Sequence, residues 1–113
     1  MLFMVIEKFK DDKTKEVYYR YQQKGRMLPD GLKYIDSWVE VNFNRCFQLM
    51  ECDDLTLFQK WILEWQDLVE FEVIPVVPSQ DAVKLNAEIN TVEDMDIDDE
   101  NPCFLNQEPN LQS

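Results

Sequence analysis

The sequence predicts an α+β fold of the ferredoxin-like βαββαβ type: a four-stranded antiparallel sheet with two helices on one face. Three observations predict it. Apolar periodicity runs in the order strand, helix, strand, strand, helix, strand over residues 2–77. The first and last strands are apolar on both faces, and both helical segments carry an apolar stripe. Right-handed connections in two such halves, joined by a hairpin, give the strand order 4-1-3-2.

The first half consists of a strand over residues 2–9 and a helix over residues 14–24. The strand begins with five consecutive apolar residues, as expected for a central strand buried on both faces. Asp11 or Asp12 is the expected N-cap of the helix, and Gly25 ends it. The apolar face of this helix, which packs on the sheet, consists of Val17, Tyr18 and Tyr21.

The central hairpin joins a strand over residues 32–41 to a strand over residues 45–52. Strict alternation in the first of these places five side chains on one face: Leu32, Tyr34, Asp36, Trp38 and Glu40. The loop between the strands leaves two registers open, with Asp36 opposite either Glu51 or Cys52. The second register avoids two facing carboxylates, so it is the one we expect.

The second half consists of a helix over residues 55–67 and a strand over residues 70–77. Asp53 or Asp54 caps this helix. Its apolar residues follow i, i+3, i+4, i+7 spacing and are Phe58, Trp61, Ile62 and Trp65. Pro75 places the last strand at an edge of the sheet, because proline lacks a backbone donor.

The composition changes after the last strand. Ser79 is the expected cap of a short helix that ends at Asn90. All 11 Lys and Arg lie within residues 1–84, together with 15 acidic residues, whereas residues 85–113 carry eight acidic residues and no basic one. We therefore expect a ferredoxin-like domain over residues 1–80, a short helix over 81–90 and an acidic, flexible tail over 91–113.

Charge and hydropathy limit the partners. The net charge is −12, and no basic face is available for phosphate groups, so we expect no nucleic-acid partner. No apolar run approaches the ~20 residues that cross a bilayer, so we expect no membrane partner. The apolar opening lacks a basic leader and a small-residue cleavage site, which favours a strand of a cytoplasmic protein.

Metal and cofactor chemistry find little support. The chain has no histidine and no CxxC motif, so we expect no metal site, no cofactor, no imidazole base and no histidine-ligated haem. Cys46 and Cys52 are ~20 Å apart along one strand, beyond disulfide reach, and are interpreted as core residues. The acidic run at Asp94 begins like a calcium loop, but Asp99 and Leu105 replace its glycine and its glutamate.

The second apolar face of the sheet needs a cover. Helices cover one side only, and a contiguous apolar patch on the other side is uncommon in monomers. A second copy of the chain, bound sheet to sheet around a two-fold axis, is the simplest cover, so we expect a homodimer. The alternative is that residues 79–90 fold back over this face, although that segment has few large apolar residues.

Several segments within residues 1–80 carry a family resemblance. They are Gly25–Pro29, Leu32–Val39, Arg45–Cys52, Trp61, Trp65–Leu68, Phe71–Glu72 and Pro75–Val76. They resemble a family of short bacterial proteins catalogued as a domain of unknown function, which implies no particular activity. By fold it resembles the dimeric α+β barrel superfamily, which includes cofactor-independent monooxygenases, muconolactone isomerases and haem-binding dismutases. The lack of histidine argues against the haem-binding branch.

Candidate site residues lie mainly on the second strand. A carboxylate beside Tyr34 and Trp38 in a half-buried pocket would have a raised pKa, which makes Asp36 and Glu40 the candidate bases. They are ~13 Å apart along the strand and cannot act as a close pair. The simpler interpretation is an edge strand whose acids face water while Trp38 packs on a neighbour.

Other candidates have equally simple structural explanations. Arg26, between Gly25 and Gly31, is able to bind a carboxylate or to be a solvated residue of a connecting loop that lacks phosphate-loop spacing. Gln48, with Arg45 and Glu51, either lines a ligand pocket or belongs to a charged edge hairpin. Trp61 and Trp65 have helical spacing and are expected in the core.

Three functions stay open at this stage. The first is a small cytosolic, dimeric α+β barrel protein that binds a small apolar molecule. The second is a cofactor-independent monooxygenase or isomerase, with Trp38 and Tyr34 lining the pocket. The third is a protein-interaction module that uses the acidic tail.

Overall fold

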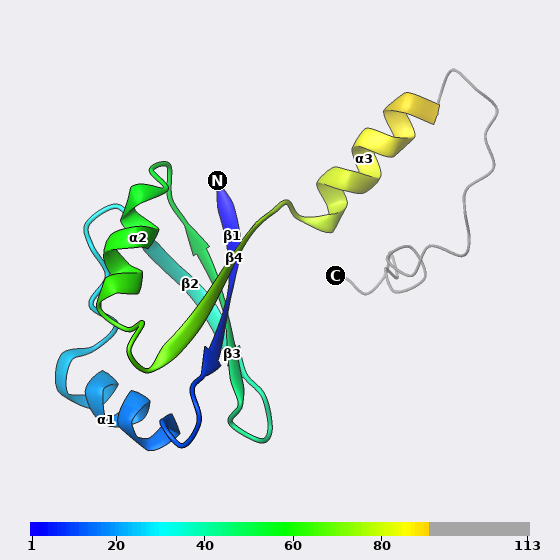
Figure 1. Ribbon diagram of the computed structural model, residues 1–113. Helices are drawn as coiled ribbons and strands as arrows, with labels where there is room; N and C mark the ends of the chain where they lie inside the picture. The colour runs from blue at the N-terminus through cyan, green and yellow to red at the C-terminus, as the bar shows by residue number, and fades with distance from the viewer. Residues whose placement is uncertain (91–113) are drawn as a thin grey trace. The chain divides into compact units, whose positions relative to one another are not determined.

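The computed structural model describes residues 1–90 (Figure 1). Its elements are β1 (Leu2–Phe9), α1 (Thr14–Lys24), β2 (Lys33–Val39), β3 (Arg45–Glu51), α2 (Thr56–Leu63), β4 (Val69–Val76) and α3 (Ser79–Asn90). Met1–Val76 form one compact unit, and a second begins at Val77. The four strands form one sheet in the order β2-β3-β1-β4, with every neighbouring pair antiparallel. The predicted βαββαβ fold and its strand order are confirmed.

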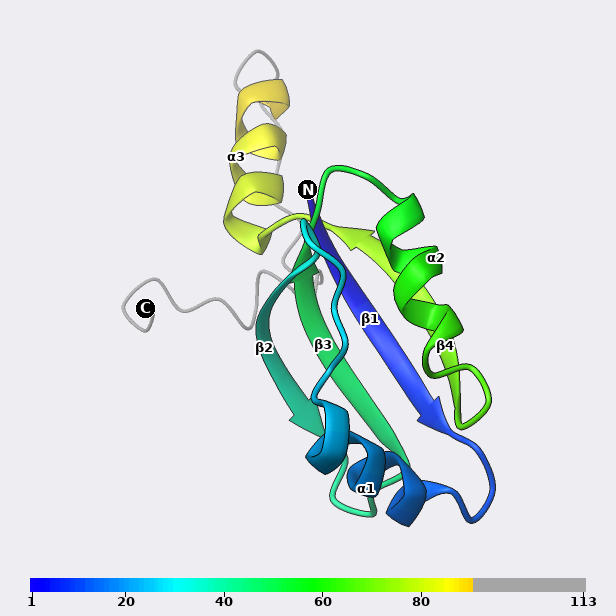
Figure 2. The same cartoon turned by 90° about the vertical axis from the view of Figure 1, so that its left-hand side faces the viewer.

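Alternation along β1 decides which residues face the helices. Its odd-numbered residues are buried, and its even-numbered residues from Leu2 to Ile6 are half-buried. Figure 2 shows α1 and α2 on the same side of the sheet. The odd-numbered residues therefore form the floor of the space beneath the helices, and they are Phe3, Val5, Glu7 and Phe9.

The core lies between this floor and α2. Three residues of the predicted apolar stripe are at most 5 % exposed: Phe58 and Trp61 of α2, and Trp65 in the turns that follow it. Ile62 is half-buried against them. The rings of Phe3 and Phe58 meet edge to face with centroids 5.0 Å apart. In α1, Val17 alone is fully buried, so α1 is the more weakly anchored cover.

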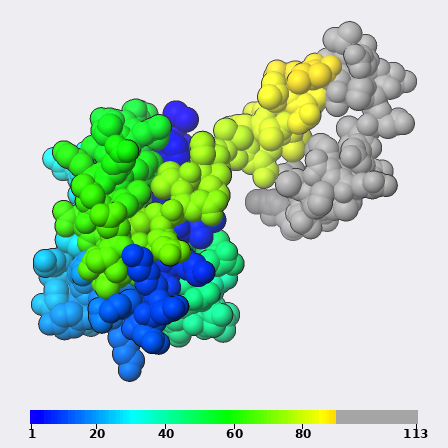
Figure 3. All heavy atoms as spheres, in the orientation of Figure 1, coloured from blue at the N-terminus to red at the C-terminus, as the bar shows by residue number. Residues whose placement is uncertain are grey.

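The α2 helix ends at Leu63, four residues before the predicted end. Residues 64–68 continue as turns in which the Trp65 carbonyl accepts from the N–H groups of Leu68 and Val69. Arg20 of α1 holds these turns: its guanidinium binds both carboxylate oxygens of Asp67 at 2.8 and 2.7 Å and donates to the Glu64 carbonyl. In the space-filling view, the green spheres around α2 lie directly against the blue spheres around α1 (Figure 3).

The two helices begin differently. The N-cap of α2 is Leu55, so the predicted cap at Asp53 or Asp54 is wrong by at least one residue. The Asp54 carboxylate, one residue earlier, accepts from the backbone N–H and the hydroxyl of Thr56. The expected cap of α1 by Asp11 or Asp12 is wrong. Lys13 occupies the N-cap position without a side-chain hydrogen bond, and Asp12 lies in the left-handed region with φ 59°. Gly25 ends α1 as predicted, with φ 69° and ψ −160°, a conformation that strongly favours glycine.

Both predicted hairpin registers are wrong. Asp36 lies opposite Leu49, instead of Glu51 or Cys52. The loop is longer than expected: the Phe43 N–H donates to the Glu40 carbonyl, and Phe43 itself takes a left-handed φ of 61°. This local turn shifts the pairing.

A β-bulge overturns the prediction that Tyr34, Asp36 and Trp38 share one face. Tyr34 pairs with Met50, but Asp36 pairs with Leu49, so Ile35 is an extra residue in β2. After the bulge the alternation is inverted. Tyr34 therefore lies on the helix-covered face of the sheet, whereas Asp36 and Trp38 lie on the open face.

The open face of the sheet has an apolar centre, as predicted, and β3 contributes to it as well. Its members are Leu2, Met4, Ile6, Trp38, Phe47, Leu49, Ile74 and Val76. Charged side chains such as Lys8, Arg45 and Glu72 surround this centre. An apolar centre with a charged rim is typical of protein interfaces.

The helix α3 spans Ser79–Asn90; it ends at the predicted residue and begins at Ser79, the expected cap, two residues before the predicted start. Within residues 1–90, no helix combines the length and the hydropathy that a bilayer span requires. The acidic tail predicted over residues 91–113 lies outside the described residues.

Candidate functional site

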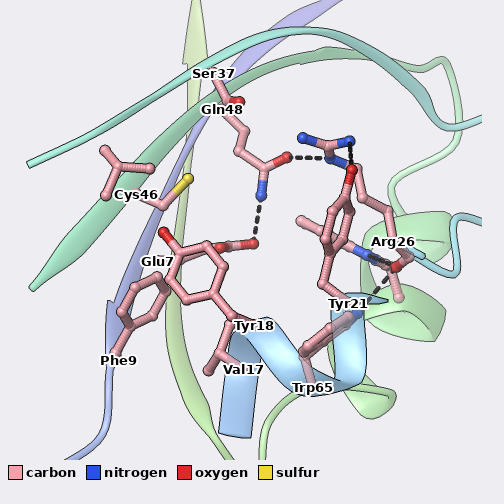
Figure 4. Close-up of a pocket in the computed structure, with 12 residues that line it drawn as sticks. Glu7, Phe9, Val17, Tyr18, Tyr21, Arg26, Ser37, Cys46, Gln48 and Trp65 are labelled. Atoms are coloured by element: carbon pink, nitrogen blue, oxygen red, sulfur yellow. Dashed lines mark hydrogen bonds between the residues drawn. The ribbon is translucent and has the colours of Figure 1, made fainter. Parts of the chain in front are cut away.

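A cavity of about 160 Å³ lies between α1, α2 and the covered face of the sheet (Figure 4). Strands β1, β2 and β3 form its floor, and aromatic side chains from both helices form its walls. Tyr18, Tyr21 and Val39 are the most exposed of these residues, each about 40 % exposed, and mark its mouth. The lining consists of Glu7, Phe9, Val17, Tyr18, Tyr21, Arg26, Ser37, Val39, Cys46, Gln48, Trp61 and Trp65.

Glu7 is the buried carboxylate of this cavity, with 8 % of its surface exposed. Its Oε2 accepts a hydrogen bond of 2.6 Å from Nε2 of Gln48. Among residues 1–90 Gln48 is the one side chain that donates to Glu7, and Oε1 is open to solvent, since no buried side-chain nitrogen or oxygen atom there lacks a partner. Burial raises the pKa of Glu7 from 4.5 to about 7, although the Gln48 hydrogen bond and the charge of Arg26 oppose this rise. The group therefore changes its charge near neutral pH.

Gln48 connects Glu7 to Arg26. Its Oε1 accepts from Nε of Arg26 at 3.2 Å, while its amide nitrogen donates to Glu7. Because a guanidinium has no acceptor atom, this contact fixes which end of the Gln48 amide points to Glu7. The guanidinium lies over the ring of Tyr34, 3.7 Å from its centroid, and Nη1 donates to the Tyr21 hydroxyl at 3.4 Å.

The backbone of Arg26 is held by the two tryptophans of the cavity wall. The indole N–H groups of Trp61 and Trp65 both donate to the Arg26 carbonyl oxygen, each at 2.9 Å. Gly25 and Met27 on either side have positive φ, which turns the chain at this point. The two tryptophans, expected in the core, are therefore core residues that also position the loop of the site.

Cys46 and Tyr18 supply further polar atoms at the cavity. Burial raises the pKa of Cys46 to about 12, and the negative charge of Glu7 adds to the effect. The thiol is therefore protonated at neutral pH and is a poor nucleophile. Burial likewise raises the pKa of Tyr18. Glu7 is thus the group of this cavity best suited to accept or give up a proton near pH 7.

The structure places the candidates chosen from the sequence in different regions. Arg26 and Gln48 line the cavity, and Tyr34 lies beneath the Arg26 guanidinium with its hydroxyl 2.6 Å from that of Ser37. Trp38 lies on the open face of the sheet and is 51 % exposed, outside the cavity lining.

The two candidate bases also lie outside the cavity lining. Asp36 is exposed, and its Oδ1 accepts from the Ser37 N–H. Glu40 pairs with Arg45 at 2.7 Å, and that hydrogen bond lowers its pKa. The carboxylate that lines the cavity is Glu7, and burial raises its pKa.

Sequence reasoning missed Glu7, because it follows a run of apolar residues and looks like the polar end of a strand. The signal that could have found it was its position in the alternation of buried and exposed residues along β1. Glu7 lies two residues after Val5 and two before Phe9, so it must share their buried face. An acidic residue in phase with the core of a central strand is a candidate functional group.

Within residues 1–90, no group of three or more Cys, Asp or Glu side chains is arranged to hold a metal ion. Cys46 and Cys52 are both free and buried. The lining of the cavity is mainly apolar and aromatic with a few polar side chains, a composition typical of sites that hold an organic molecule.

Comparison with known proteins places the chain in a family. A family model described as "Domain of unknown function (DUF3303)" matches residues 1–90, and the chain belongs to this family of α+β proteins. No curated protein and no solved structure matches it. The resemblance seen over residues 1–80 is thereby confirmed at the level of the family and extends through α3.

Proposed function

We propose that this protein binds a small, largely apolar molecule in the cavity beneath α1. The observation that best supports this is a hollow with aromatic walls in which Glu7 keeps one carboxylate oxygen without a donor. A buried carboxylate is costly unless it is hydrogen-bonded. A protein that keeps such a group beside a cavity retains it for a ligand more readily than for stability.

A cofactor-independent monooxygenase or isomerase is the second candidate. Such chemistry needs a base in contact with the substrate, and the ideal pKa of that base lies near the working pH. Glu7, with a pKa of about 7, meets this requirement within the cavity. A role of the tail in protein interactions concerns residues outside the described part of the chain and stays a prediction.

A homodimer formed through the open face of the sheet is part of this proposal. Eight apolar side chains from all four strands meet there, and an exposed apolar patch of this kind favours association. Burial contributes roughly 25 cal/mol for each Å² before the costs of association are subtracted. The cavity lies on the opposite face, so each subunit would bind its ligand independently of the interface.

Tryptophan fluorescence is a direct test of ligand binding. Trp61 and Trp65 line the cavity, whereas Trp38 lies on the other face. The Trp38→Phe variant removes the fluorescence of the tryptophan that lies outside the cavity. Titration of this variant with toluene, a small apolar probe, should change the remaining emission in a saturable way.

A pair of matched variants locates the binding site. Cys46 and Cys52 are both buried on the same face of the sheet, but only Cys46 lines the cavity. Cys46→Met should fill part of the hollow and weaken toluene binding by about tenfold, while Cys52→Met should leave it unchanged. Circular dichroism verifies that both variants fold. Equal effects of the two substitutions, or no saturable change in the parent, would contradict the proposal.

A further inference from the structure

We propose that the cavity selects neutral, single-ring molecules that carry a hydroxyl group, with phenol as the simplest example, and that this hydroxyl donates to Oε1 of Glu7. This inference rests on the proposed binding function and names the chemical class of the ligand. Four features of the cavity support it: its volume, its aromatic walls, the Oε1 atom of Glu7 that lacks a donor, and the balance of charge between Glu7 and Arg26.

The volume of the cavity matches a single ring. It is about 160 Å³, and a cavity of about 150 Å³ engineered in another protein holds one benzene molecule. The remainder of a larger ligand would project through the mouth beside Tyr18, Tyr21 and Val39, where it would gain less burial.

The walls favour an aromatic ring over an aliphatic chain. They present five aromatic side chains from β1, α1, α2 and the turns after α2, which are Phe9, Tyr18, Tyr21, Trp61 and Trp65. Aromatic rings gain about 0.5–1.5 kcal/mol from edge-to-face or offset contacts beyond the burial of their surface. Figure 4 shows Phe9, Tyr18 and Tyr21 around the carboxylate of Glu7.

The hydrogen-bonding pattern calls for a donor on the ligand. Oε2 of Glu7 accepts a hydrogen bond from the Gln48 amide, whose orientation is fixed by Arg26. Oε1 has no side-chain donor among residues 1–90. The Tyr18 hydroxyl and the Cys46 thiol are further polar groups of the cavity lining (Figure 4). A ligand hydroxyl completes the coordination of the carboxylate.

The charge balance disfavours a charged ligand. An ionised Glu7 and Arg26 sum to zero, and Gln48 joins them. The guanidinium is already engaged by Gln48, Tyr21 and the ring of Tyr34. A carboxylate ligand would face Glu7, and an ammonium ligand would share the cavity with Arg26. A neutral hydroxyl leaves this balance intact.

Four probes of similar size test the inference on the full-length chain. Phenol, toluene, benzoate and benzylammonium are titrated at pH 8, with binding followed in the Trp38→Phe variant. Phenol should bind about tenfold more tightly than toluene, because a hydrogen bond to a buried charged group is stronger than one to a neutral group. Benzoate and benzylammonium should bind more weakly than phenol.

Substitutions of Glu7 test the role of its carboxylate. Glu7→Leu should reduce the preference for phenol over toluene to about onefold, while Asp36→Leu, on the exposed opposite face, should leave it unchanged. Glu7→Gln keeps the shape and an acceptor oxygen but removes the charge. It should reduce the preference several-fold and keeps the test valid if Glu7→Leu does not fold.

The preference should depend on pH in the parent chain and not in Glu7→Gln. It should rise between pH 5 and pH 8, as Glu7 ionises and becomes the stronger acceptor. The other titratable groups that face Glu7 come from α1, the following loop and β3, and they are Tyr18, Tyr21, Arg26 and Cys46. Phe71 of β4, which pairs with Glu7, and the tryptophans of α2 carry no charge.

The outcomes separate the inference from the function on which it rests. Equal binding of phenol and toluene, or tightest binding of either charged probe, would overturn the inference and leave a general apolar site. Failure of all four probes to bind would overturn the proposed function itself. A phenol preference that survives Glu7→Leu would show that the hydroxyl contacts another group.

Discussion

At the scale of single residues, Glu7 is the carboxylate whose pKa is raised most clearly by burial. Two residues earlier on the same strand, Val5 is fully buried, and Glu7 occupies an equivalent position. Desolvation disfavours its charged form, and one hydrogen bond from Gln48 does not offset this. The folded chain therefore holds the Glu7 proton more tightly than the unfolded chain does.

This difference predicts a pH dependence of stability. The pKa of Glu7 rises from 4.5 to about 7 on folding, so its contribution is fully present below pH 4.5 and is lost as the pH rises through 7. The loss by pH 8 amounts to about 3 kcal/mol at most. Glu7→Gln removes this loss, so the free energy of unfolding of the variant relative to the parent should be larger at pH 8 than at pH 5.

Urea denaturation at the two pH values is the appropriate measurement. Glu51→Gln is the control, because Glu51 is an exposed carboxylate at the end of β3. A difference between Glu7→Gln and the parent that is the same at pH 5 and pH 8 would show that Glu7 keeps its ordinary pKa in the folded chain.

At the scale of elements, the sequence determined the order and type of strands and helices, because periodicity is a local property of the chain. It could not determine the bulge at Ile35 or the hairpin register. Both depend on the pairing of β2 with β3 and on the left-handed turn at Phe43. The bulge then moved Asp36 and Trp38 to the face opposite the cavity.

The same reasoning explains which parts of the site were predictable. Arg26 and Gln48 were chosen from the sequence as polar residues in or beside conspicuous segments, and both line the cavity. Their connection through one amide is a tertiary contact between the loop after α1 and β3, which no local pattern encodes. Glu7 was predictable from the alternation of β1, because the pattern that buries Phe3 and Val5 also buries residue 7.

At the scale of the whole molecule, the sheet separates two surfaces with different properties. The covered face contains the cavity, and the open face presents the apolar centre around Met4 and Leu49. We expect light scattering of the full chain at micromolar concentration to give about twice the chain mass of 13.6 kDa. Burial of the apolar centre provides the driving force.

Two substitutions distinguish this interface from other modes of association. Leu49→Glu places a charge in the middle of the open face and should give a monomer, because burying an unpaired charge is unfavourable. Tyr19→Glu, at an exposed position of α1, should remain a dimer. A parent chain that is monomeric at this concentration would contradict the homodimer. The open face would then be covered by the C-terminal segment or be exposed to solvent.

The most direct test of the cavity as the functional centre is a ¹³C NMR titration of the Glu7 carboxyl carbon, assigned by its loss in Glu7→Gln. A buried carboxylate above an apolar cavity should titrate with a midpoint near 7, and saturating phenol at pH 8 should shift its resonance. A midpoint near 4.5 together with no response to phenol would show that Glu7 is solvated and that the cavity has no role in recognition.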